Sequence, residues 1–178
     1  MTTPLCSLAN LHNTDKWVYT PFYYELLKDK RDSFKKILEL GVGCPKVMKH
    51  VKDYKAGASL KMWRDFFPNA QIYGIDIAPE AIFEEERIKT FLCNETNKEE
   101  LVELIETIGN DIDLVVDDGS HNPRHQVFAF QTLMPLLKKD VIYIIEDVRF
   151  KGYVSRHLSN YDYQTPDNLA TIIVKNKI

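Results

Sequence analysis

The feature that most constrains the fold is a short apolar run that ends in a dense polar cluster. Residues 114–116 are Leu-Val-Val, and residues 117–121 are Asp-Asp-Gly-Ser-His. A continuous apolar run of this kind is typical of a strand buried on both faces of a parallel sheet. In open α/β sheets, ligands bind beyond the carboxyl ends of the strands. We therefore expect the polar cluster to lie where such a fold places its chemistry.

A second apolar run repeats this pattern and ends in two acids. Residues 141–145 are Val-Ile-Tyr-Ile-Ile, and Glu146 and Asp147 follow them. If the two strands are adjacent, Asp118, Glu146 and Asp147 surround one point, with His121 one turn away. Carboxylate oxygens are ligands that hard divalent cations prefer, and an imidazole can act as a base. The sequence therefore predicts a divalent-metal site with a base beside it.

Strand and helix patterns alternate along the chain, which predicts a doubly wound, Rossmann-like α/β fold with a mostly parallel, seven-stranded sheet. The last two strands, joined by a short turn at 165–168, are expected to form an antiparallel C-terminal hairpin at the sheet edge. The expected strands are 37–40, 71–76, 89–92, 113–117, 141–146, 161–164 and 169–174. One expected helix begins at Pro21, and the others cover 58–67, 96–108, 124–137 and 154–158. The segment up to residue 16 is expected to be irregular.

Composition indicates one globular domain over residues 1–178, with residues 1–18 packing on the core. The formal net charge of -3 argues against a dedicated nucleic-acid binder. No apolar run approaches the roughly 20 residues that span a membrane, and the first residues do not resemble a secretory leader. The three cysteines lack the spacing of a disulfide framework or zinc site, so we expect a reducing cytoplasm. The oligomeric state stays open, a homo-oligomer included.

Two further features favour an adenosine-bearing ligand. Residues 39–43, Glu-Leu-Gly-Val-Gly, follow a predicted strand, and glycines let the backbone bend sharply and approach a ligand. Asp76 ends the second predicted strand, where an acid commonly accepts hydrogen bonds from ribose hydroxyls. An ordinary strand-to-helix turn is the alternative for the glycines, and a helix cap or turn former is the alternative for Asp76. A nicotinamide dehydrogenase is a weaker alternative, because it would more typically show three glycines that run directly into a helix.

The order of these motifs resembles class I S-adenosylmethionine-dependent methyltransferases. Longer stretches are similar to the metal-dependent sugar O-methyltransferases of macrolide and aromatic polyketide biosynthesis. These stretches are 57–68 (GASLKMWRDFFP), 116–121 (VDDGSH) and 145–147 (IED), together with 14–16 (TDK) and 19–24. The resemblance extends from about Asn13 to Val174.

The resemblance implies an O-methyltransferase that uses S-adenosylmethionine and Mg²⁺, or another divalent cation, to methylate a sugar hydroxyl. The acceptor would be a deoxysugar, a glycan or a glycosylated metabolite. The resemblance implies that Asp118, Glu146 and Asp147 bind the metal, and that His121 and Asp118 are catalytic, His121 as the general base. The cofactor residues that it implies are Glu39, Gly41, Gly43, Ser59, Asp76, Asn94 and Asp117.

Two of these cofactor assignments have alternatives. The family usually has an aspartate within a Gly-Asp-Gln-Ser run near adenine, whereas residues 93–96 here are Cys-Asn-Glu-Thr. Asn94 can still hydrogen-bond adenine through its amide, with a changed pattern of donors and acceptors. Asp117 either contacts the cofactor or caps the following helix.

The predicted chemistry accounts for the cluster of acids and histidine. A sugar hydroxyl is a poor acid, and a divalent cation that chelates two neighbouring hydroxyls would orient them and lower the pKa of one. His121 could then remove the proton. A metal-dependent O-methyltransferase of a catechol or other diol is one alternative, because such a diol chelates a metal in the same way. A non-catalytic cofactor-binding domain of a glycan-modifying protein is the other.

Overall fold

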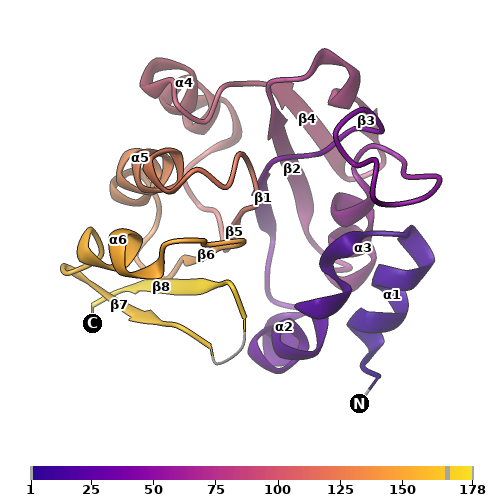
Figure 1. Ribbon diagram of the computed structural model, residues 1–178, viewed down its shortest axis with the longest axis horizontal. Helices are drawn as coiled ribbons and strands as arrows, with labels where there is room; N and C mark the ends of the chain where they lie inside the picture. Colours follow the sequence, from indigo (N-terminus) through magenta and orange to yellow (C-terminus); the bar gives the residue numbers. More distant parts are fainter. Residues whose placement is uncertain (1, 167–168, 178) are drawn as a thin grey trace.

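The computed structural model describes residues 2–166 and 169–177, and within them eight strands form one mixed sheet (Figure 1). The strand order is β3-β4-β2-β1-β5-β6-β8-β7. The five central strands are parallel, and the pairings at both edges are antiparallel. The strands are β1 Lys36–Leu40, β2 Gln71–Asp76, β3 Glu84–Glu85, β4 Ile88–Leu92, β5 Leu114–Asp117, β6 Ile142–Ile145, β7 Tyr161–Gln164 and β8 Ile172–Asn176.

The predicted α/β class and its antiparallel C-terminal strands are confirmed, whereas the predicted number of strands is one too low. The additional strand is β3, whose two residues pair antiparallel with Ile88 and Lys89 of β4. Arg87, in the left-handed backbone conformation, lies in the turn between them. Two exposed glutamates show no apolar alternation, so the sequence pattern gives no signal for this strand. Residues 167–168 of the predicted C-terminal turn lie outside the described residues.

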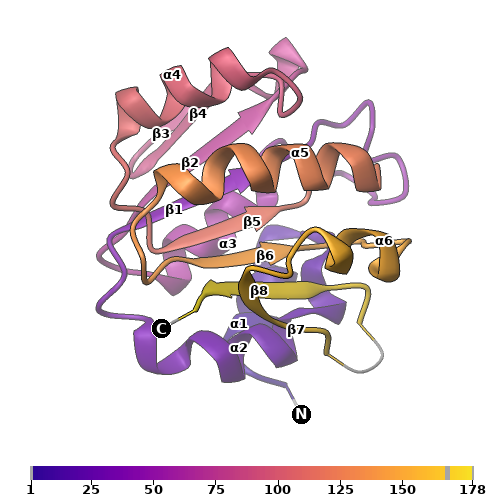
Figure 2. The same ribbon diagram turned by 90° about the vertical axis from the view of Figure 1, so that its left-hand side faces the viewer.

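Helices cover both faces of the sheet (Figure 2). One core lies between the sheet and α4, α5 and α6, and the other lies between the sheet and α1, α2 and α3. The helices are α1 Pro4–His12, α2 Thr20–Leu27, α3 Ala58–Phe66, α4 Lys98–Ile108, α5 Pro123–Leu133 and α6 Lys151–Arg156, with 3₁₀ turns at Asp15–Val18, Lys28–Lys30, Pro79–Ala81 and Met134–Leu136. None of these described helices has the length and apolar character needed to cross a membrane.

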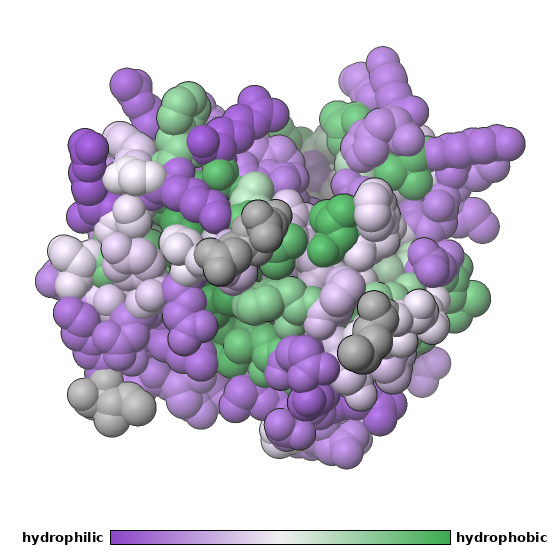
Figure 3. All heavy atoms as spheres, turned by 60° about the horizontal axis from the view of Figure 1, so that its bottom comes forward, coloured by the Kyte–Doolittle hydropathy of each residue, from purple (hydrophilic) through white to green (hydrophobic). Residues whose placement is uncertain are grey.

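Apolar side chains also reach the surface near the antiparallel edge. Figure 3 shows them gathered at the centre of the face that carries α2 and the β7–β8 pair, with hydrophilic side chains around them. Phe22, Leu26 and Leu169 are partly buried against the core beneath α1, α2 and α3. This surface continues that core outward.

The first twelve residues contain a helix that the sequence pattern did not predict. Thr3 caps α1 by accepting a hydrogen bond from the Cys6 backbone N–H, and Pro4 occupies the first turn. Leu5 and Ala9, one turn apart, are fully buried in the core that α1 shares with α2 and α3. Leu5, Leu8 and Ala9 stand at helical spacing after a Thr-Pro start, so the sequence did carry a helix signal here, and the prediction of an irregular segment was wrong.

The burial of Leu5 gives a test of this helix. We expect Leu5→Ala to lower the free energy of unfolding by about 2–5 kcal/mol, because it leaves a cavity in a closely packed core. Leu11→Ala is the matched control, since Leu11 is 70% exposed on the same helix; its effect should stay within about 0.5 kcal/mol. Urea unfolding followed by circular dichroism measures both values. Equal effects of the two substitutions would contradict the packing of α1 described here.

Candidate active site

The alternation of side chains along the central strands brings two predicted site residues to the same face of the sheet. Ile37 of β1 and Ile144 of β6 both lie in the core beneath α1, α2 and α3. Successive side chains of a strand point to opposite faces, so Glu39 and Glu146, each two positions further on, face that same side. Both carboxylates are at most 1% exposed.

A buried lysine lies among these carboxylates. Lys16, from the first 3₁₀ turn, donates from Nζ to Asp118 Oδ2 at 2.6 Å and to Glu146 Oε2 at 2.8 Å. The same Nζ lies 3.6 Å from Glu39 Oε1. Burial alone would lower the pKa of Lys16, but the carboxylates of Asp118, Glu146 and Glu39 raise it well above its usual value. The ammonium therefore stays charged inside the protein.

Burial has the opposite effect on the carboxylates. It raises the pKa of Glu146 to about 8, and the charges of Asp118 and Glu39 act in the same direction, whereas Lys16 opposes them. Burial likewise raises the pKa of Glu39, again against the effect of Lys16. These directions identify Lys16 as the main positive charge that compensates the buried acids.

Neutral donors satisfy the remaining oxygens of the two glutamates. Glu39 accepts hydrogen bonds from Ser59 Oγ and from Trp63 Nε1, both at 2.5 Å and both from α3. Glu146 Oε1 accepts one from the hydroxyl of Tyr23 at 2.8 Å. Glu39 and Ser59, both expected near the cofactor, are thus in direct contact.

A second cluster, more open to solvent, joins three of the predicted metal and base residues. Asp118, His121 and Asp147 offer ligand atoms that all lie within 4.8 Å of one another. His121 Nδ1 is 3.9 Å from Asp118 Oδ1, and Nε2 is 3.7 Å from Asp147 Oδ2. Tyr19 donates from its hydroxyl to Asp147 Oδ1 at 2.6 Å. Glu146, the remaining predicted ligand, is adjacent in sequence but outside this cluster, with its oxygens on Lys16 and Tyr23.

The donor set of this cluster fits a divalent cation. Two carboxylates and an imidazole can ligate such an ion, and the buried His121 Nδ1 has no hydrogen-bond partner among the described residues. His121 and Asp147 also have positive φ angles, of 55° and 50°. Such left-handed conformations are unfavourable for residues other than glycine and cluster at functional sites.

The predicted glycine turn lies directly against the polar cluster. A Cβ on Gly41, whose φ is +90°, would come within 2.2 Å of the carbonyl oxygen of Asp118. Only glycine therefore fits at this junction of β1 and β5. Asp76 Oδ2 accepts hydrogen bonds from the backbone N–H groups of Val42 and Gly43 at 3.1 and 3.0 Å. Asp76 thus shapes the turn, which is the turn-forming role considered as an alternative to ribose binding.

Two apolar side chains lie exposed beside Asp76. The register pairs Asp76 of β2 with Leu92 of β4, and Ile77 follows Asp76 directly. Leu92 is 59% exposed and Ile77 is 70% exposed. Asn94, two residues beyond β4, accepts hydrogen bonds at Oδ1 from the backbone N–H and the hydroxyl of Thr96. Asn94 itself is exposed.

Asp117 lies on the opposite face of the sheet from Lys16. It is fully buried, with Oδ2 3.4 Å from the Tyr143 hydroxyl, and Oδ1 has no partner in the part of the chain that the structure describes. Burial, followed by the nearby charge of Glu95, raises the pKa of Asp117 well above its usual value. The structure thus separates Asp117 from the Asp118–His121–Asp147 cluster.

Sequence reasoning missed Lys16, Tyr19 and Tyr23 as members of the site. Lys16 and Tyr23 contact Glu146 across 130 and 123 positions of the chain, and Tyr19 contacts Asp147 across 128. Local patterns cannot reveal contacts of this range. The only signal was the resemblance of residues 14–16 and 19–24 to a known family, and it assigned no role to them.

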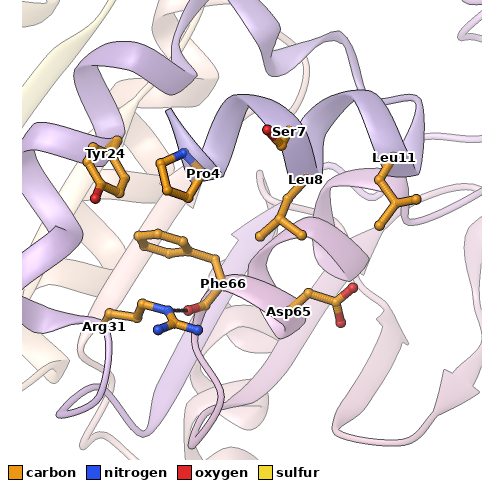
Figure 4. A pocket seen from close by; sticks show the side chains of 8 residues that line it. All are labelled: Pro4, Ser7, Leu8, Leu11, Tyr24, Arg31, Asp65 and Phe66. Atoms are coloured by element: carbon orange, nitrogen blue, oxygen red, sulfur yellow. Dashed lines mark hydrogen bonds between the residues drawn. The ribbon is translucent and has the colours of Figure 1, made fainter. Parts of the chain in front are cut away.

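A separate groove of about 600 Å³ lies between α1, α2 and α3 (Figure 4). Arg31 Nε donates to the Phe66 carbonyl at 2.8 Å along its floor. None of its lining residues comes from a strand end, so it is not the site described above. The residues that line it are Pro4, Ser7, Leu8, Leu11, Tyr24, Arg31, Asp65 and Phe66.

Comparisons with known proteins point to methyltransferases. No family model matches the chain. The chain is 36% identical over 148 residues to the 8-demethyl-8-alpha-L-rhamnosyl tetracenomycin-C 2'-O-methyltransferase of Streptomyces olivaceus. This match covers 82% of this chain and 38% of that protein. It is 37% identical over 130 residues to the mycinamicin VI 2''-O-methyltransferase of Micromonospora griseorubida, covering 73% of this chain and 31% of that protein.

The solved structures agree with these relatives. The methyltransferase MycE, in complex with Mg, S-adenosylhomocysteine (SAH) and mycinamycin VI, superposes with a TM-score of 0.79 at 27% identity. The match covers 98% of this chain and 55% of that chain. An SAH-bound methyltransferase of Podospora anserina, at 13% identity and a TM-score of 0.67, shares the fold. The chain spans about two fifths or less of the length of these curated relatives, and about half of MycE.

The position of Glu39 at the centre of the buried network gives a second test. We expect Glu39→Gln to lower the free energy of unfolding by about 1–3 kcal/mol, because the amide leaves Ser59 or Trp63 without an acceptor. Glu106→Gln, on the exposed face of α4, is the matched control and should have little effect. Urea unfolding compares the two variants. A Glu39→Gln variant as stable as the wild type would show that the network is not structural.

Proposed function

Because the chain is a homologue of the sugar O-methyltransferases of macrolide and polyketide pathways, we propose that it transfers a methyl group from S-adenosylmethionine to a sugar hydroxyl. The observation that carries the proposal is the cluster of Asp118, His121 and Asp147 at the strand ends, directly beside the glycine turn. This juxtaposition puts a base and metal ligands next to the expected cofactor site. The acceptor class is a deoxysugar, a glycan or a glycosylated metabolite.

Cofactor binding at the glycine turn is supported by the surface around it. Gly41 and Gly43 have positive φ angles and leave the backbone free of side chains at the end of β1. Exposed apolar surface on neighbouring strand ends, here Ile77 and Leu92, is typical of a ligand-binding position, and a flat adenine ring could cover it. We propose that Glu39, Ser59, Asp76, Asn94 and Asp117 complete or support this site.

The metal would be bound by Asp118 and Asp147, with Glu146 as the third ligand. Because Glu146 already accepts hydrogen bonds from Lys16 and Tyr23, it would bind the ion through a remaining lone pair. When bound, a divalent cation orients two neighbouring hydroxyls and lowers the pKa of one of them. The exposed edge of the cluster at Asp147, which is 47% exposed, leaves room for an acceptor to approach.

His121 would then accept the proton of the hydroxyl that is methylated. Its ring lies between the carboxylates of Asp118 and Asp147, which would stabilise the imidazolium that forms. Tyr19 fixes the side chain of Asp147 from the other side. The ligand atoms of His121, Asp147 and Asp118 lie within 4.8 Å of one another, which would place the base beside the proposed metal site.

Four expectations from composition stay predictions. The first is a single domain over residues 1–178, with residues 1–18 packed on its core. The others are a cytoplasmic location, the absence of a nucleic-acid or membrane partner, and the possibility of a homo-oligomer.

Calorimetric titration with SAH tests the cofactor class. We expect micromolar binding of SAH and none of NAD, because the turn at 41–43 lacks the third glycine of a dinucleotide site. Repeating the titration with and without Mg²⁺ separates the cofactor and metal sites. Binding of NAD instead, or of neither ligand, would overturn the methyltransferase proposal.

A substitution of the proposed base tests the chemistry. His121→Ala should lower kcat for methyl transfer about 10²- to 10⁴-fold while SAH affinity stays unchanged, because only proton removal is lost. His157→Ala is the control, since the ring of His157 lies on Tyr153, with Nδ1 2.9 Å from the Tyr153 carbonyl oxygen and the ring centroids 4.9 Å apart. A panel of sugar glycosides and catechols, assayed with labelled S-adenosylmethionine, identifies the acceptor class. Activity of His121→Ala within tenfold of the wild type would exclude His121 as the base, and transfer to catechols alone would replace the sugar acceptor.

A further inference from the structure

The carboxylates at the strand ends, two of them buried, have an unusual arrangement of compensating charge. Glu39, Asp118 and Glu146 converge on one ammonium, that of Lys16, whose side chain is 1% exposed. Taking carboxylates out of water without a partner charge is strongly unfavourable, and removal of one partner from a buried pair is destabilising. The described residues place no other lysine or arginine within 4.0 Å of these three carboxylates.

In many metal sites the ion itself supplies the compensating charge, so that binding and folding are coupled. Here Lys16 is already present, and it uses a carboxylate that the metal site also needs. Asp118 Oδ2 accepts a hydrogen bond from Lys16, while Oδ1 faces His121 in the metal-binding cluster. One carboxylate therefore lies between the ammonium and the position of the ion.

We propose that Lys16 is an internal counter-cation. Its charge lets the strand ends that carry these carboxylates stay folded without a bound divalent ion, and the same charge weakens the binding of that ion. The proposal rests on the metal site proposed above. Lys16 acts through Asp118 and Glu146, so it is a positioning residue. Its positive charge repels a second cation on the same carboxylate, and the repulsion is largest where water is excluded. The ion then binds weakly enough that ligands from the acceptor can contribute to holding it.

The first readout is the dependence of thermal stability on Mg²⁺. For the wild type we expect chelator and millimolar Mg²⁺ to give nearly the same Tm. Lys16→Met should have a lowered Tm in chelator, or be unfolded, and Mg²⁺ should raise its Tm by at least about 5 °C, because the ion replaces the lost charge. Lys16→Arg keeps the charge and should remain insensitive to Mg²⁺. Lys49→Met, which removes an exposed lysine, is the matched control.

The second readout is the affinity for Mg²⁺, measured by calorimetry in the presence of SAH. Lys16→Met should bind Mg²⁺ at least about tenfold more tightly than the wild type, because the repelling charge is gone. Lys16→Met combined with Glu39→Gln leaves fewer uncompensated charges while every proposed metal ligand stays in place, and it serves if the single variant does not fold. Stability insensitive to Mg²⁺ in both variants, failure of both to fold with Mg²⁺, or weaker Mg²⁺ binding would each overturn the proposal.

These outcomes separate the two proposals. If the wild type binds SAH and Mg²⁺ but Lys16→Met shows no dependence on Mg²⁺, only the role of Lys16 is wrong. If the wild type with SAH does not bind Mg²⁺ at all and no acceptor is methylated, the proposed function itself fails.

Discussion

The contact of Lys16 with Asp118 and Glu146 is the interaction on which the rest of the site depends. It joins the first 3₁₀ turn to the ends of β5 and β6, more than a hundred positions away in the chain. Without it, buried carboxylates would lack their main compensating charge. The N-terminal segment thus completes the site at the strand ends. The preceding helix α1 packs on α3, with Leu5 and Ala9 in their shared core.

The sheet explains why these residues meet. Parallel strands place their carboxyl ends at one edge, and alternation sends Glu39 and Glu146 toward Lys16 but Asp117 to the opposite face. Gly41 lets β1 pass directly over the backbone of Asp118. The glycine turn and the Asp118–His121–Asp147 cluster are therefore neighbours at the strand ends, as the proposed reaction between a cofactor and an activated hydroxyl requires.

Strong, local patterns were predictable from the sequence, and long-range contacts were not. The apolar run before Asp117 predicted the central strand, and the two strand ends predicted the meeting of Asp118, His121 and Asp147. The pattern could not show that Lys16 lies against Glu146, nor that Asp76 binds the backbone of its own glycine turn. Such roles depend on which side chains the fold brings together, whereas periodicity reports only which face of an element is buried.

The most direct test of the account is the anomalous scattering of Mn²⁺ in crystals grown with SAH. We expect a peak within about 2.5 Å of carboxylate oxygens of Asp118 and Asp147, with SAH against the turn that contains Gly41 and Gly43. A peak elsewhere, or SAH bound away from that turn, would contradict the assignment of the strand-end cluster as a metal-dependent methyl-transfer site.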